Sequence, residues 1–149
     1  MALAAPLAIP PELKISFAWT RVRGNRVYVA GHSARLPDGS PAEPFGKVPT
    51  EASLDAARHA ARLTALSILG SLRRRLGGVD HVSAWLTVFG LVNAEPGYGQ
   101  TTNVINDSGD LILELYGPER GENARVAAGV GALPLNNAGI VAAEVEIDG

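Results

Sequence analysis

The run from Val82 to Val92 constrains the fold more than any other stretch of this chain. Its letters, V-S-A-W-L-T-V-F-G-L-V, are apolar on both faces of a strand, which is typical of a central strand buried on both sides. The chain offers only two helical stretches, and strand–helix–strand crossovers are right-handed, so both helices should lie on the same side of the sheet. The other face of the sheet then needs a cover, and we expect a second copy of the protein to provide it.

Segments with strand and helix patterns follow one another in an order that predicts an α+β fold. The first helix should be capped by Thr50 or Ser53 and end near Leu76, where Gly77-Gly78 follows. The other predicted elements are a hairpin of 15–22 and 26–31 around Gly24-Asn25, a loop over 36–49, a helix over 99–116 ended by Gly117-Pro118, and a last strand over 139–147. We therefore predict a mixed β-sheet with two helices packed on one face.

The bulk properties of the 149-residue chain suit a single domain. We predict an N-terminal arm over 1–14 and one folded domain over 15–149. The arm is apolar but lacks the basic start of a signal peptide, and no apolar run has the length of a membrane span. The absence of cysteine fits a cytoplasmic location, and the net charge of -2 offers no positive field for nucleic acid. Neither a membrane nor a nucleic acid is an expected partner.

Arg125 is the one permanent charge in the stretch 123–134, which reads N-A-R-V-A-A-G-V-G-A-L-P. The small apolar residues after it predict a buried strand, ended by Gly131 and a Leu133-Pro134 turn. A guanidinium prefers flat, two-pronged anions, and when it is buried it needs a carboxylate partner. That partner is either an acid of the protein itself, with Glu144 as a candidate, or the carboxylate of a ligand.

Four motifs, in this order, resemble those of the RidA/YjgF family, in the branch labelled endoribonuclease L-PSP/chorismate mutase-like. They are V-Y-V-A-G-H after Gly24-Asn25, L-G-G-V-D-H-V at the end of the first helix, V-I-N-D-S-G-D-L-I-L-E-L-Y-G in the second helix, and A-R-V-A-A-G-V-G-A-L-P-L-N. The resemblance runs from about Phe17 to Ile147 and implies a chorismate-mutase-like RidA fold of the bacillary type. It also implies a homotrimer with ligand clefts between neighbouring subunits.

The resemblance implies an activity as well. The best-known reaction of the family is the hydrolysis of enamine and imine intermediates, such as 2-aminoacrylate, to a 2-keto acid and ammonia, without a metal or an organic cofactor. An arginine at the position of Arg125 grips the substrate carboxylate, which holds a small ligand in place for attack by water. The expected ligand is thus a small carboxylate and the expected enzyme an imine deaminase. A non-catalytic binding or regulatory member is the alternative, and ribonuclease activity is the least favoured.

Other positions of the family site carry different side chains in this chain. The pocket tyrosine falls on Phe17 and the S-G-Q motif on 30–32, so the resemblance makes Phe17 and Gly31 substrate-binding residues. The family glutamate, which is thought to handle the water, falls on Ile140 in an alignment without a gap. Glu144 takes that position only if the turn over 135–139 contains an insertion.

Four polar residues complete the candidate set. His32 could replace the missing acid–base group, because histidine titrates near neutrality, or it is a hydrogen-bonded loop residue. Asn103 and Asn106, one helical turn apart, could donate to a ligand or reflect ordinary helix polarity. Glu144 is either catalytic or part of an ion-paired row with Glu146. The three histidines of the chain lack metal-ligand spacing, so no metal site is predicted.

Overall fold

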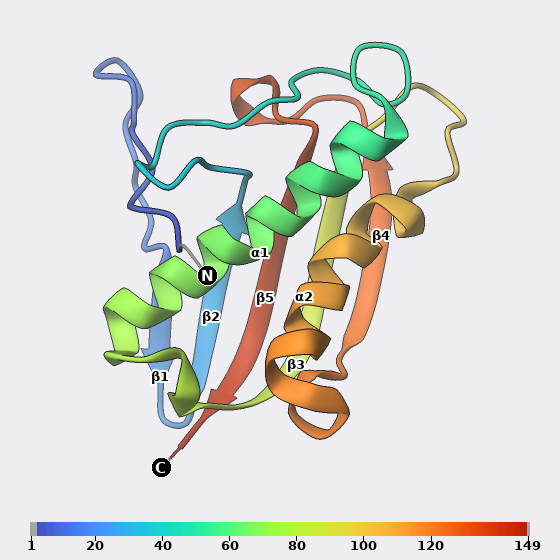
Figure 1. Cartoon of the computed structure of the whole chain (residues 1–149). Coiled ribbons are helices and arrows are strands. Elements are labelled where there is room, and N and C mark those ends of the chain that lie inside the picture. Colours follow the sequence, from blue (N-terminus) through green and yellow to red (C-terminus); the bar gives the residue numbers. More distant parts are fainter. Residues whose placement is uncertain (1–2, 149) are drawn as a thin grey trace.

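A five-stranded mixed sheet forms one layer of the computed structural model, which describes residues 3–148 (Figure 1). The strands are β1 (Thr20–Arg23), β2 (Arg26–His32), β3 (Val82–Asn93), β4 (Ala124–Val130) and β5 (Gly139–Ile147). They lie in the order β1-β2-β5-β3-β4, with β3 and β4 parallel and the other neighbours antiparallel. The predicted hairpin is confirmed, although its first strand is shorter than expected and begins at Thr20.

Helix α1 (Leu54–Leu76) has the predicted length, and its two ends show why. The Ser53 side chain caps the start by accepting from the Ala56 backbone N–H at 3.1 Å, and Gly77 ends it with a positive φ of 85°. Helix α2 (Thr101–Gly121) bends at Gly117, whose φ is 75°. The expected end of the helix is therefore a kink, and one more turn follows it. Short 3-10 turns occur at Val79–His81 and Pro134–Asn136.

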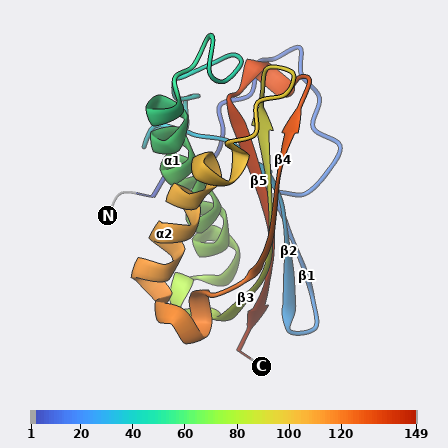
Figure 2. The same ribbon diagram turned by 90° about the vertical axis from the view of Figure 1, so that its right-hand side faces the viewer.

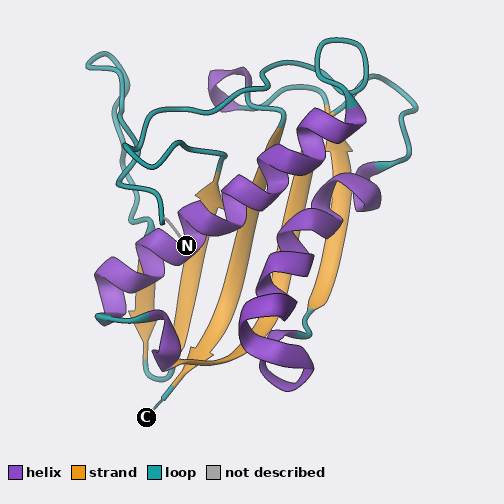
Figure 3. Cartoon of the chain, in the orientation of Figure 1, coloured by secondary structure: helices purple, strands orange, loops and turns teal. Residues whose placement is uncertain are grey.

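Both helices cover the same face of the sheet, as predicted (Figures 2 and 3). The core lies between these two layers, and its largest fully buried side chains include Trp85, Ile68, Leu69 and Leu72. Ser108 of α2 donates a buried hydrogen bond of 2.6 Å to the Ala61 carbonyl of α1, which ties the two helices together. The sheet is open, and in the described part of the chain no helix covers its second face, although part of the N-terminal arm lies near Ile140 at one end of it (Figure 2).

The prediction that the stretch 123–134 forms a buried strand is wrong. β4 is an edge strand, none of its residues is fully buried, and Val126 is 53% exposed. β3 is likewise covered on one side alone within the chain. Its Val88 and Val92 side chains are buried under the helices, whereas Phe89 is 49% exposed on the open face. Apolar residues on both faces of β3 and β4 gave the pattern of full burial, but a single chain covers just one face.

The first described residues of the N-terminal arm cross α1, and later ones lie at the hollow beside Gly31. Ala4 is buried, its carbonyl accepts from the Arg74 guanidinium at 2.9 Å, and the Ala5 N–H donates to the Pro37 carbonyl at 3.0 Å. Gly70 permits this crossing, because a Cβ there would lie 2.5 Å from the Ala4 carbonyl oxygen. Within residues 3–148, no helix combines the length and the apolar content that crossing a bilayer requires.

Candidate ligand site at Arg125

Arg125 lies on the edge strand β4 and reaches toward helix α2. It pairs in register with the buried Val88, so its side chain is on the helix-covered side of the sheet. One Nη donates to the Asn106 side-chain oxygen at 2.7 Å. A shallow hollow of about 380 Å³ opens beside this pair, and it is lined by Asn106, Gly109, Asp110, Leu113, Gly121, Glu122, Asn123 and Arg125. The structure thus brings together two of the residues that the sequence singled out.

The Arg125 guanidinium forms no salt bridge within residues 3–148. The Asn106 amide that it contacts is neutral, so its positive charge is not neutralised by that contact. Two carboxylates, Asp110 and Glu122, line the same hollow without pairing with the guanidinium. The hollow therefore presents a cation and two anions side by side, a combination that suits a ligand with a carboxylate and a protonated nitrogen.

Phe17 and Gly31 lie together in a second hollow, and this one is apolar. Its volume is about 230 Å³, and its lining is Leu7, Leu13, Lys14, Ile15, Phe17, Trp19, Gly31, Ser33, Pro134, Leu135, Asn137 and Ile140. Phe17 is 54% exposed there. This hollow borders β2 and β5, and the sheet order places β3 between β5 and Arg125 on β4. Within one chain, the candidate binding residues thus fall into two separate groups.

Ile140 is the residue that faces Gly31. A Cβ added to Gly31 would lie 2.7 Å from the Ile140 Cγ2 atom, and both residues line the apolar hollow. Glu144 is elsewhere, paired in register with Tyr28 and Thr87. Ile140, on which the family glutamate falls in an alignment without a gap, thus lies at the apolar hollow, and Glu144 does not. Among the described residues, none that lines the apolar hollow carries a carboxylate.

His32 is buried, with 1% of its surface exposed. Its Nδ1 lies 2.6 Å from the Ala30 carbonyl oxygen and must donate to it, so Nε2 accepts from the Ser71 hydroxyl at 2.7 Å. Burial, with smaller contributions from the positive charges of Arg35 and Arg74, lowers the pKa of His32 from 6.5 to about 4, although the hydrogen bond to the Ala30 carbonyl acts to raise it. A neutral imidazole with both nitrogens engaged stabilises the junction of β2 and α1, and it lines neither hollow.

The two other candidates have local partners. Glu144 accepts a salt bridge of 2.7 Å from Arg26 on the neighbouring strand, which excludes it as the internal partner of Arg125. Asn103 donates to the Gln100 side chain at 3.1 Å, at the start of α2. Neither residue lines the hollows around Arg125 and Gly31. The sequence did not single out Asp110, Glu122 or Trp19, because only the folded chain brings them to the hollows.

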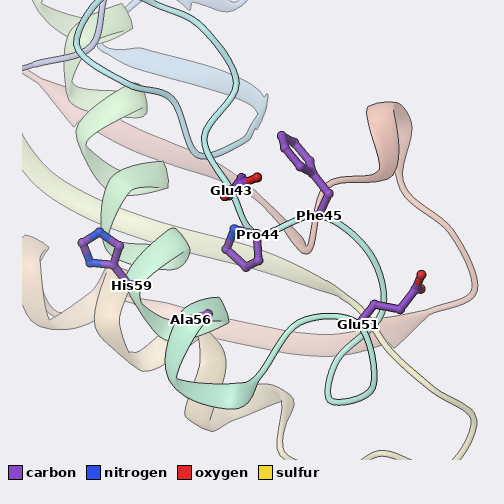
Figure 4. Close-up of a pocket in the computed structure, with 6 residues that line it drawn as sticks. All are labelled: Glu43, Pro44, Phe45, Glu51, Ala56 and His59. Carbon is purple, nitrogen blue, oxygen red and sulfur yellow. The ribbon is translucent and has the colours of Figure 1, made fainter.

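A third hollow, of about 480 Å³, lies between the loop over 36–49 and the start of α1. Glu43, Pro44 and Phe45 come from the loop, and Ala56 and His59 from the helix (Figure 4). Figure 4 shows Glu51 and His59 at opposite ends of this group, with Glu43 and Pro44 between them. Within residues 3–148, no set of three or more His, Asp or Glu side chains is placed to hold a metal ion.

Comparison with known proteins supports the fold. No protein-family model matches the chain. Protein TCP17 of Trypanosoma cruzi is 37% identical over 89 residues, which make up 60% of this chain and 56% of that protein, so the match spans little more than half of its length. The Agrobacterium tumefaciens protein Atu1372, of unknown function, is 30% identical, with a TM-score of 0.85 over 91% of this chain and 85% of that chain.

Two further solved structures share the fold at low sequence identity. RidA from an Antarctic Psychrobacter is 17% identical, with a TM-score of 0.61 over 96% of this chain and 94% of that chain. Escherichia coli TdcF, crystallised with bound serine, is 16% identical, with a TM-score of 0.60 over 97% of this chain and 94% of that chain. The resemblance to RidA/YjgF proteins is thereby confirmed in the fold, and the chain belongs to one family with Atu1372.

Proposed function

We propose that this protein binds a small carboxylated metabolite through Arg125, in clefts between the subunits of a homotrimer. The observation that carries the proposal is the Arg125 guanidinium, which lies at an open hollow and has a neutral amide, Asn106, as its polar partner within residues 3–148. A guanidinium without a salt bridge can form two parallel, charge-assisted hydrogen bonds with a carboxylate of a ligand.

The charges of the hollow narrow the ligand class. Arg125 would hold the carboxylate of the ligand, and Asp110 or Glu122 would hold a protonated nitrogen on the same molecule. Amino acids and their 2-imino derivatives have both groups. The TdcF structure contains one such molecule, serine. A 2-imino or 2-amino acid is therefore the ligand that we favour.

The open face of the sheet supports the homotrimer. Tyr28, Phe89 and Val126 expose large apolar side chains on this face, and soluble monomers rarely leave such patches uncovered. A second and third copy of the chain would cover the face and could bring the apolar hollow of one subunit to the Arg125 hollow of its neighbour. The cytoplasmic location expected from the sequence stays a prediction.

Hydrolysis of an enamine or imine to a 2-keto acid and ammonia is the reaction that we propose for this site. The carbon of an iminium group is already electrophilic, so the protein need only position a water molecule and accept its proton. With Ile140 at the family's glutamate position, Asp110 or Glu122 would have to accept that proton. Binding without turnover is the second candidate, and the apolar lining around Phe17 and Ile140 favours it.

The test compares two variants, each of which removes one arginine side chain and its positive charge. Arg125→Gln removes the proposed carboxylate grip, and Arg73→Gln removes an exposed guanidinium on α1 that has no hydrogen-bonded side-chain partner within residues 3–148. Calorimetry with 2-ketobutyrate should show affinity weaker by about 10- to 100-fold for Arg125→Gln and unchanged for Arg73→Gln. A second assay, the release of 2-keto acid from 2-iminopropionate, shows whether the protein is an enzyme or binds its ligand without turnover.

Two results would reject the proposal. One is equal affinity for 2-ketobutyrate in both variants. The other is a monomer by light scattering at the protein concentrations used for binding, because the proposed cleft needs two subunits. Binding that depends on Arg125 without keto-acid release would select the non-catalytic candidate.

A further inference from the structure

A second group of arginines lies on the opposite side of the fold from β4, where the N-terminal arm crosses α1. A hollow of about 370 Å³ opens there, and it is lined by Pro6, Trp19, Thr20, Ser71, Arg74 and Arg75. We call it the cationic hollow. It shares no residue with the hollow beside Arg125.

A third guanidinium, that of Arg35, is buried behind the Trp19 wall of this hollow. Arg35 is 3% exposed, its carbon Cζ lies 5.5 Å from the centre of the Trp19 ring, and one Nη donates to the Ala5 carbonyl at 3.2 Å. Its Nε is buried and has no hydrogen-bond partner in the described part of the chain. Burial, together with the like charge of Arg74, lowers the pKa of Arg35 to about 10. Buried charges are normally paired, so this arrangement is costly for the protein alone.

No carboxylate within residues 3–148 forms a salt bridge with any of these three arginines. The adjacent His32 is neutral and adds no negative charge. The C-terminal end of α1 supplies a partial charge of about half a unit, against three guanidinium groups. The group therefore has an excess of positive charge that the described part of the chain does not neutralise.

Several donors of the cationic hollow are unused. Arg74 donates one bond to the Ala4 carbonyl at 2.9 Å and one to the Ser71 hydroxyl at 3.2 Å, which leaves three of its five N–H groups. The side chains of Arg75 and Thr20 have no hydrogen-bond partner within residues 3–148. Two forked guanidinium groups and a hydroxyl can together surround the oxygens of one tetrahedral anion.

We propose that the cationic hollow binds a phosphate group, either free or carried on a small metabolite. A phosphate carries about -1.5 to -2 charges at neutral pH and presents three or four acceptor oxygens, which matches two lining guanidiniums with a third behind them. A carboxylate has a single charge and needs one guanidinium, so it would leave most of the excess uncompensated. The volume of the hollow leaves room for a small organic group beside the phosphate.

Neighbouring residues of α1 provide a matched test. Arg75→Gln removes a lining guanidinium with no structural bond, Arg74→Gln removes the one that also holds the arm, and Arg73→Gln removes an exposed charge outside the hollow. The full-length protein is titrated with inorganic phosphate and, separately, with glycerol 3-phosphate, at constant ionic strength set by chloride. Binding is followed by calorimetry and by the fluorescence of Trp19, corrected with a Trp19→Phe variant.

We expect saturable binding that is about tenfold or more weaker in Arg75→Gln and Arg74→Gln, and unchanged in Arg73→Gln and Arg125→Gln. Tighter binding of glycerol 3-phosphate would identify a phosphorylated metabolite as the ligand, and equal or tighter binding of inorganic phosphate would identify the free ion. The proposal is overturned if millimolar phosphate acts no differently from chloride, or if Arg73→Gln weakens binding as much as Arg75→Gln. Phosphate binding is expected to be the same in Arg125→Gln as in the original chain. The test of the cationic hollow is therefore independent of the function proposed for Arg125.

Discussion

Gly31→Ala tests the contact that places Ile140 in the apolar hollow. The new Cβ would lie 2.7 Å from the Ile140 Cγ2 atom, about 1 Å inside an ordinary carbon–carbon contact. Cγ2 is attached directly to the branched Cβ of Ile140, whose χ1 angle is stiff, so the side chain cannot easily swing away. Gly31 does not have a positive φ, and alanine therefore fits its backbone conformation. We expect Gly31→Ala to lower the free energy of unfolding by about 1–3 kcal/mol through overpacking.

A double-mutant cycle with Ile140→Ala isolates that contact. Ile140→Ala removes the clashing methyl group, so adding Gly31→Ala should then cost close to nothing, and the coupling free energy should be about 1–3 kcal/mol. Urea unfolding followed by tryptophan fluorescence measures all four free energies, at one protein concentration because subunit association contributes to stability. If Gly31→Ala costs the same in the original chain and in the Ile140→Ala variant, the two residues are not in contact. The placement of Ile140 at the apolar hollow would then be wrong.

Three other changes test the interior of the fold. The pKa of His32 is about 4 in the folded chain and 6.5 ordinarily, so the unfolded chain takes up the proton at a higher pH than the folded chain does. The free energy of unfolding should therefore fall by about 3 kcal/mol as the pH drops from 6.5 to 4. Urea unfolding of His32→Gln should show a smaller loss over the same pH range. Ser108→Ala should lower the free energy of unfolding by about 1 kcal/mol, since it deletes the buried bond to the Ala61 carbonyl; an unchanged urea midpoint would contradict that bond. Ser53→Ala should cost about 1 kcal/mol by removing the cap of α1, and thermal unfolding with no shift would show that the cap does not matter.

The order of the elements was predictable because the signals are local. Ser53 and Gly77 mark the two ends of α1 through side-chain and backbone chemistry that needs no other part of the chain. The right-handed crossover rule then placed both helices on one face. Burial was harder to predict: the same small apolar residues suit an interior strand and an edge strand, and only the position of β4 in the sheet distinguishes the two.

The candidate site was predictable only in part, for the same reason. Arg125 stood out as a lone charge in an apolar stretch, and Asn106 was a candidate for contact with a ligand, but the sequence did not predict that the two would bond to each other at 2.7 Å. The structural role of His32 was not predictable, because the Ser71 hydroxyl that occupies its Nε2 lies 39 positions later in the chain. In the sequence, Asp110 is one of several charged residues on the solvent-exposed face of a helix, and only the fold brings it to the same hollow as Arg125.

The Trp19 indole forms part of the wall of two hollows with opposite chemistry, the apolar one beside Gly31 and the cationic one beside Arg74. A ligand that displaces this ring from one side changes the shape offered to a ligand on the other. Linkage requires the effect to be reciprocal, so each ligand must alter the affinity for the other by the same factor. Ligands in the two hollows would therefore be coupled through one aromatic side chain.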